Sequence, residues 1–166
     1  MTKENVGSLF EEYKSQIYRL CVQLAKNQAD AEDLFQDTFL LALQKNGRID
    51  EHQNPRSYLY TMCLNLWKTG KRKRTAVYSS EGADSLVFSE TPEDAMLFKE
   101  QKQIIIQAVK ALKDKYRIPV ILYYSADMPV SEIAQVLKIP EGTVKSRLYK
   151  ARALLKERLG EQDGKQ

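Results

Sequence analysis

Residues 128–159 read MPVSEIAQVLKIPEGTVKSRLYKARALLKERL, and this stretch predicts two short helices joined by a tight turn. Apolar residues recur at helical spacing on one face of each segment: Ile133, Ala134 and Leu137 in the first, and Val144, Leu148, Ala151 and Leu155 in the second. The Ile-Pro-Glu-Gly segment at 139–142 separates them, because proline lacks an amide hydrogen and glycine loosens the backbone beside it. The pattern is typical of a helix-turn-helix.

The outward face of the second helix in this motif is rich in basic and hydrogen-bonding side chains. Its members are Thr143, Lys145, Ser146, Arg147, Tyr149, Lys150 and Arg152. Such a composition suits a helix that lies in the major groove of duplex DNA, where these side chains reach base edges and phosphates. The alternative is a basic solvated face on an ordinary helical hairpin. The two interpretations share a fold and differ in function.

The charges of the chain are segregated along the sequence. The protein has 166 residues and a net charge of +4, yet residues 57–80 carry five basic groups and no acid. Basic groups also dominate residues 138–159, whereas acids dominate residues 81–103 between the two basic segments. A polyanion that contacts the chain at two places would explain this pattern, because neutralising phosphates supplies most nonspecific affinity for nucleic acids.

Several classes of protein are disfavoured by the composition. No apolar run approaches the ~20 residues needed to span a bilayer, and the N-terminus has no apolar signal core, so we expect a cytoplasmic protein without membrane insertion. Cys21 and Cys63 lie in apolar helical stripes without ligand partners, which predicts buried free thiols and no metal site. With one histidine and no glycine-rich loop, we expect neither an enzyme nor a cofactor.

The N-terminal half begins with two predicted helices. The first spans roughly residues 9–24 by its apolar period, and a polar segment interrupts it. Asp30 is expected to cap the second helix, with Asp33 three residues later as in a capping box. Acids near the cap need no further function than capping and solvation. Asp37, however, lies beyond the first turn, and Phe39, expected to be exposed beside it, indicates a partner surface.

A third helix is predicted from Pro55, and its core face is expected to hold Leu59, Met62, Cys63 and Leu66. A second stripe consists of Tyr58, Thr61, Asn65, Lys68 and Arg72. This stripe suits single-stranded nucleic acid, because rings stack on unpaired bases, amides read base edges and cations hold the backbone. The alternative is a core helix that ends in a solvated Lys-Arg tail. Trp67 beside the stripe belongs either to the core or to a stacking platform.

A change of composition divides the chain into two domains. Residues 75–90 are rich in Ser, Gly, Ala and acids, which predicts a flexible acidic linker between domains at 1–74 and 91–166. Nothing alternates at period two over a useful length, so no sheet is expected. The expected fold is therefore all-α, with two small helical domains, the C-terminal one containing the helix-turn-helix.

Two further helices are expected between the linker and the helix-turn-helix. Thr91 as cap and Pro92 at the first helical position should open the first of them, which is expected to continue through Leu97, Ile104, Ile105, Ala108 and Leu112. The second is expected over residues 119–126, which are too apolar to stay uncovered.

Three segments together resemble a bacterial RNA polymerase sigma factor of the extracytoplasmic-function (ECF) group of the sigma-70 family. Residues 30–40, DAEDLFQDTFL, resemble region 2.2 of that family. Residues 58–65, YLYTMCLN, with the Lys-Arg run that follows, resemble regions 2.3 and 2.4, and residues 132–148 resemble region 4.2. A helix-turn-helix alone occurs in many regulators, whereas all three segments in this order are specific to the family.

The resemblance implies roles for particular residues. Region 2.2 docks on the clamp helices of the largest polymerase subunit, which implies a core-binding surface of Asp33, Gln36, Asp37 and Phe39. Regions 2.3 and 2.4 melt and read the −10 element, which implies contacts from Tyr58, Asn65, Lys68 and Arg72, with Asn65 at a flipped base. Region 4.2 reads the −35 element, which implies contacts from Thr143, Lys145, Ser146, Arg147, Tyr149 and Lys150.

The resemblance also implies partners. They are core RNA polymerase, promoter DNA and an anti-sigma factor, with no cofactor and no catalytic residue. The alternative is a helix-turn-helix transcriptional regulator whose N-terminal half is a sensor or dimerisation domain. That alternative predicts specific duplex binding by the isolated protein, and it leaves the stripe around Asn65 unexplained.

Overall fold

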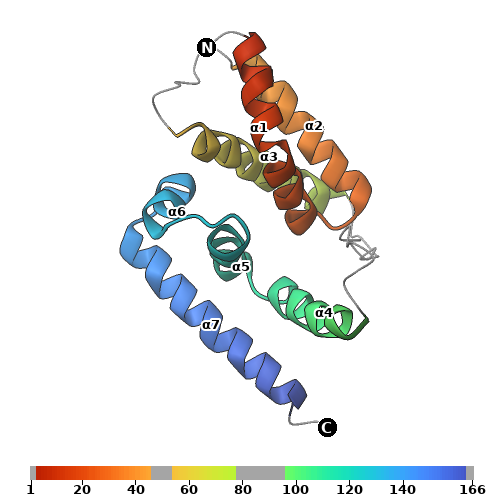
Figure 1. The fold of residues 1–166 in the computed structure, drawn as a ribbon, viewed down its shortest axis with the longest axis vertical. Coiled ribbons are helices and arrows are strands. Elements are labelled where there is room, and N and C mark those ends of the chain that lie inside the picture. Colours follow the sequence, from red (N-terminus) through yellow and green to blue (C-terminus); the bar gives the residue numbers. More distant parts are fainter. Residues whose placement is uncertain (1–2, 46–53, 78–95, 164–166) are drawn as a thin grey trace. The chain divides into compact units, whose positions relative to one another are not determined.

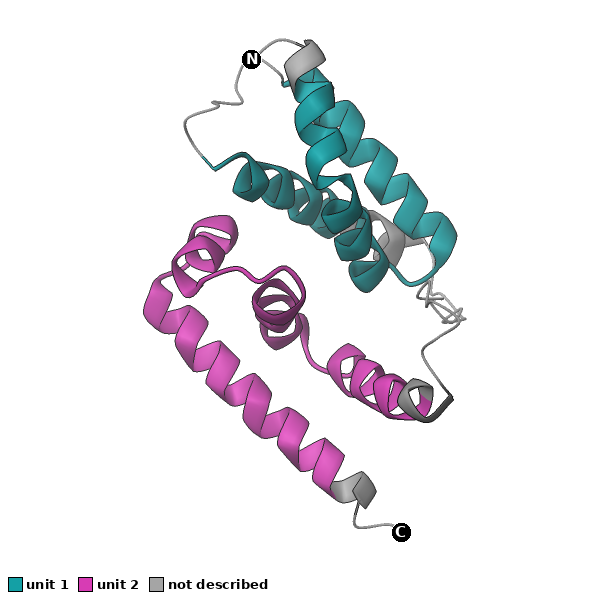
Figure 2. Ribbon diagram, viewed as in Figure 1, with its two compact units in different colours: residues 1–88 teal, residues 89–166 magenta. Residues whose placement is uncertain are grey.

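A computed structural model of the chain describes residues 3–45, 54–77 and 96–163 (Figure 1). The chain divides into two compact units, residues 1–88 and 89–166 (Figure 2). All regular elements within the described residues are helices, so the expected all-α fold with two small helical domains is confirmed. The predicted linker at 75–90 falls mostly outside the described residues, and its bounds stay a prediction; α3 itself continues to Val77.

Unit 1 is a bundle of three helices, α1 (Lys3–Leu24), α2 (Gln28–Gln44) and α3 (Pro55–Val77). Each helix packs against the other two. The largest side chains that are almost fully buried in this unit are Val6, Ile17, Leu59, Tyr60 and Leu64. A shared apolar core of this kind is what allows three amphipathic helices to hold one another in place.

The start of α2 differs from the expectation that Asp30 caps it. The helix begins at Gln28, and Asn27 is the capping residue, with extended backbone at φ −149° and ψ 172°. The Asn27 Oδ1 accepts a hydrogen bond of 2.8 Å from the backbone N–H of Asp30, and the Asn27 Nδ2 donates to the Asp30 carboxylate at 3.2 Å. Asp30 is therefore the third helical residue and the partner of the cap, a place that also suits the helix dipole.

The buried face of α3 is broader than expected. Tyr60 and Leu64 are almost fully buried beside Leu59 and Cys63, whereas Leu66, expected in the core, is only half-buried. The face is shifted toward Tyr60 and Leu64 because α3 packs against two helices, and two neighbours cover a wider arc than one.

Trp67 belongs to the edge of this core. Its indole Nε1 donates a hydrogen bond of 3.1 Å to the carbonyl of Leu24, the last residue of α1. That carbonyl has no partner within its own helix, so the indole satisfies one of the open acceptors at the end of α1. Trp67 is thus engaged in holding α3 to α1, which answers the question that the sequence left open.

Unit 2 contains α4 (Met96–Lys110), α5 (Asp114–Val120), a π-helical turn η2 (Ile121–Ser125), α6 (Val130–Leu137) and α7 (Glu141–Asp163). The long α7 packs against α4, α5 and α6. The core comprises Ala108, Leu112, Ile118, Val120, Ile121, Leu122, Met128, Ile133, Ala134, Val136, Val144, Leu148 and Ala151. None of the described helices in either unit combines the length and apolarity needed to cross a membrane.

One helix of unit 2 starts earlier than expected. The helix expected over 119–126 begins at Asp114, where the Asp114 carboxylate pairs with the Arg117 guanidinium at 3.1 Å, and Pro119 lies inside it. Ile104 and Ile105 lie in α4, as expected, and are 39% and 51% exposed, because the described part of α4 is covered within its unit only toward its C-terminal end. The expected cap at Thr91 and Pro92 lies outside the described residues.

Candidate nucleic-acid and polymerase-binding surfaces

The helix-turn-helix predicted from the sequence is formed by α6 and α7. Ile133, Ala134 and Val136 of α6 are buried, as are Val144, Leu148 and Ala151 of α7, whereas the expected core residues Leu137 and Leu155 are half-buried. Lys138 ends α6 in the left-handed region at φ 57°, and its N–H donates to the carbonyl of Ala134. The Pro140 carbonyl then accepts bonds of 3.1 Å from the N–H groups of Thr143 and Val144, which starts α7.

The outward face of α7 holds the residues expected to read duplex DNA. Lys145, Ser146, Tyr149 and Lys150 are exposed, while Thr143 and Arg147 are half-buried. Tyr149 is 76% exposed, so its ring is accessible to a partner. The Ser146 hydroxyl donates to the Thr143 carbonyl at 3.0 Å, which orients its oxygen as an acceptor toward solvent.

The stripe of α3 is brought together on the side opposite the core. Asn65 and Lys68 are exposed, and Tyr58 is half-buried. The Thr61 hydroxyl donates to the Ser57 carbonyl at 2.7 Å and the Thr69 hydroxyl to the Asn65 carbonyl at 2.9 Å, so these two groups are used within the helix. α3 continues as a helix past these residues to Val77, which places the backbone of Arg72 on the same stripe, while its side chain lies outside the described part.

The acidic face of α2 is only partly as expected. Asp33, Gln36 and Asp37 are exposed, but Phe39 is half-buried, with its ring centroid 4.8 Å from that of Phe10 in an edge-to-face contact. The expectation that Phe39 is exposed was therefore wrong. The exposed apolar residue of this face is its neighbour Leu40, which is 54% exposed.

Helical geometry explains this exchange. Asp33, Asp37 and Leu40 are spaced i, i+4 and i+7, so they lie on one stripe, whereas Phe39 falls on the side that faces α1. This spacing is visible in the sequence, and it identifies Leu40 as an exposed member of the face that had not been predicted.

The two cysteines are buried and free, as predicted. Their sulfur atoms lie 3.6 Å apart between α1 and α3 and share a hydrogen bond. This hydrogen bond to Cys63, together with burial, raises the pKa of the Cys21 thiol far above its ordinary value. Within the described residues, no cluster of three or more His, Cys, Asp or Glu side chains is arranged to hold a metal ion.

Family models match both units of the chain. The model for sigma-70 region 2 matches residues 9–77, and the model for sigma-70 region 4 matches residues 102–155. The ECF RNA polymerase sigma factor SigW of Bacillus subtilis is 32% identical over 162 residues, an alignment that covers 89% of this chain and 84% of SigW. The chain belongs to the ECF RNA polymerase sigma factors.

Other proteins are similar to this chain over most of their length. The ECF sigma factor SigM of Bacillus subtilis is 27% identical, covering 91% of this chain and 93% of SigM. Among solved structures, the sigma factor RpoE from Bartonella quintana, in complex with the anti-sigma factor NepR, has a TM-score of 0.81 at 22% identity, with 95% of this chain and 98% of that chain covered. CnrH, in complex with the cytosolic domain of CnrY, has a TM-score of 0.72 at 19% identity, with 96% and 90% covered.

Membership of the family gives the general function of the chain. It is a sigma factor, a protein that directs RNA polymerase to promoters, and sigma factors as a family are not enzymes. The region 2 match contains the α2 face and the α3 stripe, and the region 4 match contains the outward face of α7. The three surfaces assembled from single residues therefore fall inside the two segments that define the family.

Proposed function

We propose that this sigma factor binds core RNA polymerase through α2, holds the melted −10 strand on α3, and reads the −35 duplex with α7. The observation that carries the proposal is the pair of basic, hydrogen-bonding faces on separate units, each opposite the core of its own unit. The face on α3 includes exposed Asn65 and Lys68, and the face on α7 includes exposed Lys145 and Tyr149. No catalytic residue is needed, because binding and trapping unpaired bases suffice.

The docking surface on α2 is proposed to be Asp33, Gln36 and Asp37, with Leu40 in the apolar role first given to Phe39. The carboxylates are exposed on one stripe, and Leu40 continues that stripe. Charged groups around an exposed apolar residue form a surface that can both steer a cationic partner and bury apolar area against it. Phe39 supports the surface from behind by packing against Phe10.

The −10 surface on α3 is proposed to act on unpaired bases. Asn65 is exposed in the middle of the stripe, so its amide can pair with the edge of a base that has left the duplex. Tyr58, one end of the stripe, is half-buried and offers part of a ring for stacking, and Lys68 offers a charge to the backbone. Unstacking a base costs a few kcal/mol, and stacking with hydrogen bonds on the protein offsets this cost.

The −35 surface on α7 is proposed to read base edges from the first turns of the helix. Thr143, Lys145 and Ser146 lie there, and N-terminal residues of a recognition helix are those that reach the bases. Lys145 is suited to the acceptors of guanine in the major groove. Tyr149 and Lys150 follow one turn later and are suited to the adjacent backbone and methyl groups.

An anti-sigma factor is proposed as the regulatory partner, and the cytoplasm as the compartment. The neighbours RpoE and CnrH were solved with NepR and with the cytosolic domain of CnrY. In this chain, exposed Leu40, Ile104 and Ile105 are apolar groups that a protein partner would cover. A protein that acts on RNA polymerase and promoter DNA works where those partners are.

Run-off transcription tests the proposal directly. Purified core polymerase is incubated with a library of promoter fragments, with the full chain, without it, or with an Asn65→Ala variant. We expect discrete transcripts only with the chain, and we expect Asn65→Ala to lower their yield while leaving the stability of the protein unchanged, since Asn65 is exposed. Transcripts that do not depend on the chain would contradict the proposal. Specific duplex binding without polymerase would favour a helix-turn-helix regulator instead.

A further inference from the structure

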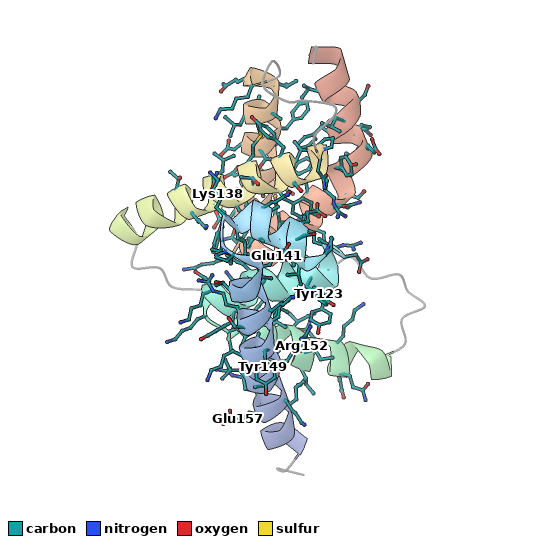
Figure 3. The ribbon with its side chains drawn as sticks, turned by 90° about the vertical axis from the view of Figure 1, so that its left-hand side faces the viewer. Tyr123, Lys138, Glu141, Tyr149, Arg152 and Glu157 are labelled. Carbon is teal, nitrogen blue, oxygen red and sulfur yellow. The ribbon has the colours of Figure 1, made fainter. Side chains whose placement is uncertain are left out.

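Arg152 of α7 contacts two tyrosines of η2, Tyr123 and Tyr124. Figure 3 labels Arg152 and Tyr123. The Arg152 Nε donates a hydrogen bond of 2.7 Å to the Tyr124 hydroxyl. Its guanidinium carbon lies 5.5 Å from the centroid of the Tyr123 ring and 5.7 Å from that of the Tyr124 ring. The rings themselves are in edge-to-face contact at 4.9 Å, so each fixes the other.

This cation has no acid as a partner in the described part of the chain. Its interactions there are with the two tyrosines alone, and the hydrogen bond to Tyr124 raises the pKa of Arg152 further above its usual range. Arg117 shows the contrast within the same unit, because its guanidinium is largely buried and pairs with the Asp114 carboxylate at 3.1 Å. Arg117 is neutralised inside the fold, whereas Arg152 presents an ordered, uncompensated charge to solvent.

The position of Arg152 on α7 relates it to the proposed DNA-reading face. Lys145, Tyr149 and Arg152 are spaced i, i+4 and i+7, so they form one stripe along the helix. Arg152 lies about three turns from the start of α7, roughly 10 Å along the axis from Lys145. A recognition helix reads bases near its N-terminus, so a residue this far along lies where the helix leaves the groove and passes the backbone.

We propose that Arg152, positioned by Tyr123 and Tyr124, is a clamp for a single backbone phosphate of the promoter duplex next to the −35 element. The proposal rests on the proposed role of α7. The terminal guanidinium nitrogens donate to the phosphate oxygens, and the Tyr124 hydroxyl, which accepts from Nε, directs its own proton to the same phosphate. Because the side chain is already ordered, less conformational entropy is lost when the phosphate binds.

Such a clamp carries no base information. It sets the register of α7 on the duplex, so that Lys145 meets its base pair. The rival explanation is that Arg152 only holds η2 against α7, and that its charge plays no part in binding DNA. The two explanations differ in the salt dependence of binding and in its dependence on one particular phosphate.

The first test measures Kd of the holoenzyme, core polymerase with the full chain, for a fluorescent promoter duplex over a range of KCl concentrations. Arg152→Gln is expected to weaken binding about tenfold, the effect of one charge-assisted hydrogen bond, and to the same extent for every −35 sequence. The slope of log K against log salt should fall in magnitude by about 0.9. The matched control is Arg158→Gln, an equal loss of charge at another exposed position of α7, which should leave the slope unchanged.

The second test replaces single phosphates near the −35 element by neutral methylphosphonates. One replacement should weaken binding by the wild type but not by Arg152→Gln. Tyr124→Phe keeps the aromatic ring and the charge of Arg152 but removes the hydroxyl. In this variant the same methylphosphonate should weaken binding about threefold less than in the wild type, as expected for one lost hydrogen bond. Tyr124→Phe retains this readout even if Arg152→Gln fails to fold.

Three results would overturn the clamp. They are an unchanged salt slope in Arg152→Gln, equal sensitivity of wild type and variant to every replaced phosphate, and a loss confined to one −35 sequence. The last result would make Arg152 a reader of bases. Failure of the proposed function is distinguishable, because then the wild-type holoenzyme itself would show no preference for promoter duplex.

Discussion

Asp37 is the residue at which the proposed contact with polymerase can be tested without disturbing the fold. Its carboxylate is exposed on the stripe shared with Asp33 and Leu40. Reversing the charge by Asp37→Arg is expected to weaken binding to core polymerase about tenfold or more, since like-charge juxtaposition in an interface costs several kcal/mol. Fluorescence anisotropy of labelled chain titrated with core polymerase measures this effect.

The matched control for Asp37→Arg is Glu12→Arg, the same reversal at an exposed position of α1. Both variants should melt within a few degrees of the wild type, because neither position is buried. Equal affinity of the Asp37 and Glu12 variants for core polymerase would remove α2 from the docking surface.

At the scale of single side chains, the sequence predicted exposure well where charge decides it and poorly where a ring can face either way. Asp33, Gln36 and Asp37 were placed outside correctly, because a carboxylate or amide without a partner costs free energy when buried. Phe39 could not be placed from its own helix, since its burial depends on Phe10 of α1. The spacing of residues within one helix does not show which side chains of another helix pack against them.

The buried thiol pair predicts a pH dependence of stability. Cys21 is fully buried, and the hydrogen bond to Cys63 and burial raise its pKa in the folded state. The unfolded thiol ionises near pH 8.5, so above that pH the unfolded state binds fewer protons than the folded state. The free energy of unfolding should therefore fall as pH rises, by about 1.4 kcal/mol between pH 7.5 and 9.5 from this thiol alone.

Denaturant unfolding of wild type and Cys21→Ala at the two pH values isolates this contribution. Trp67, the single tryptophan, lies in unit 1 and reports its unfolding. The destabilisation caused by Cys21→Ala should shrink as pH rises, because the variant has lost the titrating group. Leu20→Ala, a neighbouring core change without a titrating group, should cost the same at both pH values. A constant cost for Cys21→Ala would contradict the shifted pKa.

At the scale of elements, the start of α2 depends on one cap. Asn27→Ala removes the oxygen that accepts from the Asp30 N–H and should lower the free energy of unfolding by about 1 kcal/mol. Asn27→Ser keeps an acceptor at the same place and should restore most of that loss. Gln28→Ala, an exposed change one residue later, should have an effect below about 0.5 kcal/mol. Chemical unfolding followed at Trp67 distinguishes these values.

Element boundaries show which part of the fold the sequence could predict. The turn between α6 and α7 was predicted because Pro140 and the apolar spacing around it leave little choice. The starts of α2 and α5 were not, because Asn27 and Asp30 both have the chemistry of a cap, and Pro119 resembles a helix start although it lies inside α5. Local chemistry allows both alternatives in each case, and packing decides between them.

The helix α7 is proposed to make two kinds of DNA contact, one to bases and one to a phosphate, and substitutions can separate them. Lys145 lies in the first turns of α7. If it reads a base, Lys145→Ala should lower the binding free energy by about 1–3 kcal/mol, and the loss should depend on the base pair at one −35 position. Kd values of the holoenzyme for promoters that differ at single −35 base pairs measure this loss. An equal loss for all sequences would instead assign Lys145 to a phosphate, the role proposed here for Arg152.

At the scale of the whole molecule, the proposed promoter specificity is divided between two units with separate cores. Unit 1 carries the α2 face and the α3 stripe, and unit 2 carries α7. The affinity of each proposed DNA contact alone is expected to be modest. The two affinities combine only when both contacts are held at the spacing of the two promoter elements. Core polymerase, the partner proposed to hold both units on one promoter, is the component expected to provide that spacing.

Promoter discrimination should therefore depend on polymerase rather than on the chain alone. We expect the free chain to bind a promoter and a duplex with scrambled −35 and −10 elements with nearly equal Kd, because its basic faces attract any phosphate backbone. With core polymerase present, the ratio of the two Kd values should rise to about a hundredfold or more, the gain available from linking two weak contacts. Both Kd values are measured at one salt concentration. Asp37→Arg should return the ratio toward that of the free chain, and Glu12→Arg should not. A free chain that discriminates as well as the holoenzyme would mean that the helix-turn-helix acts alone, as in a conventional regulator.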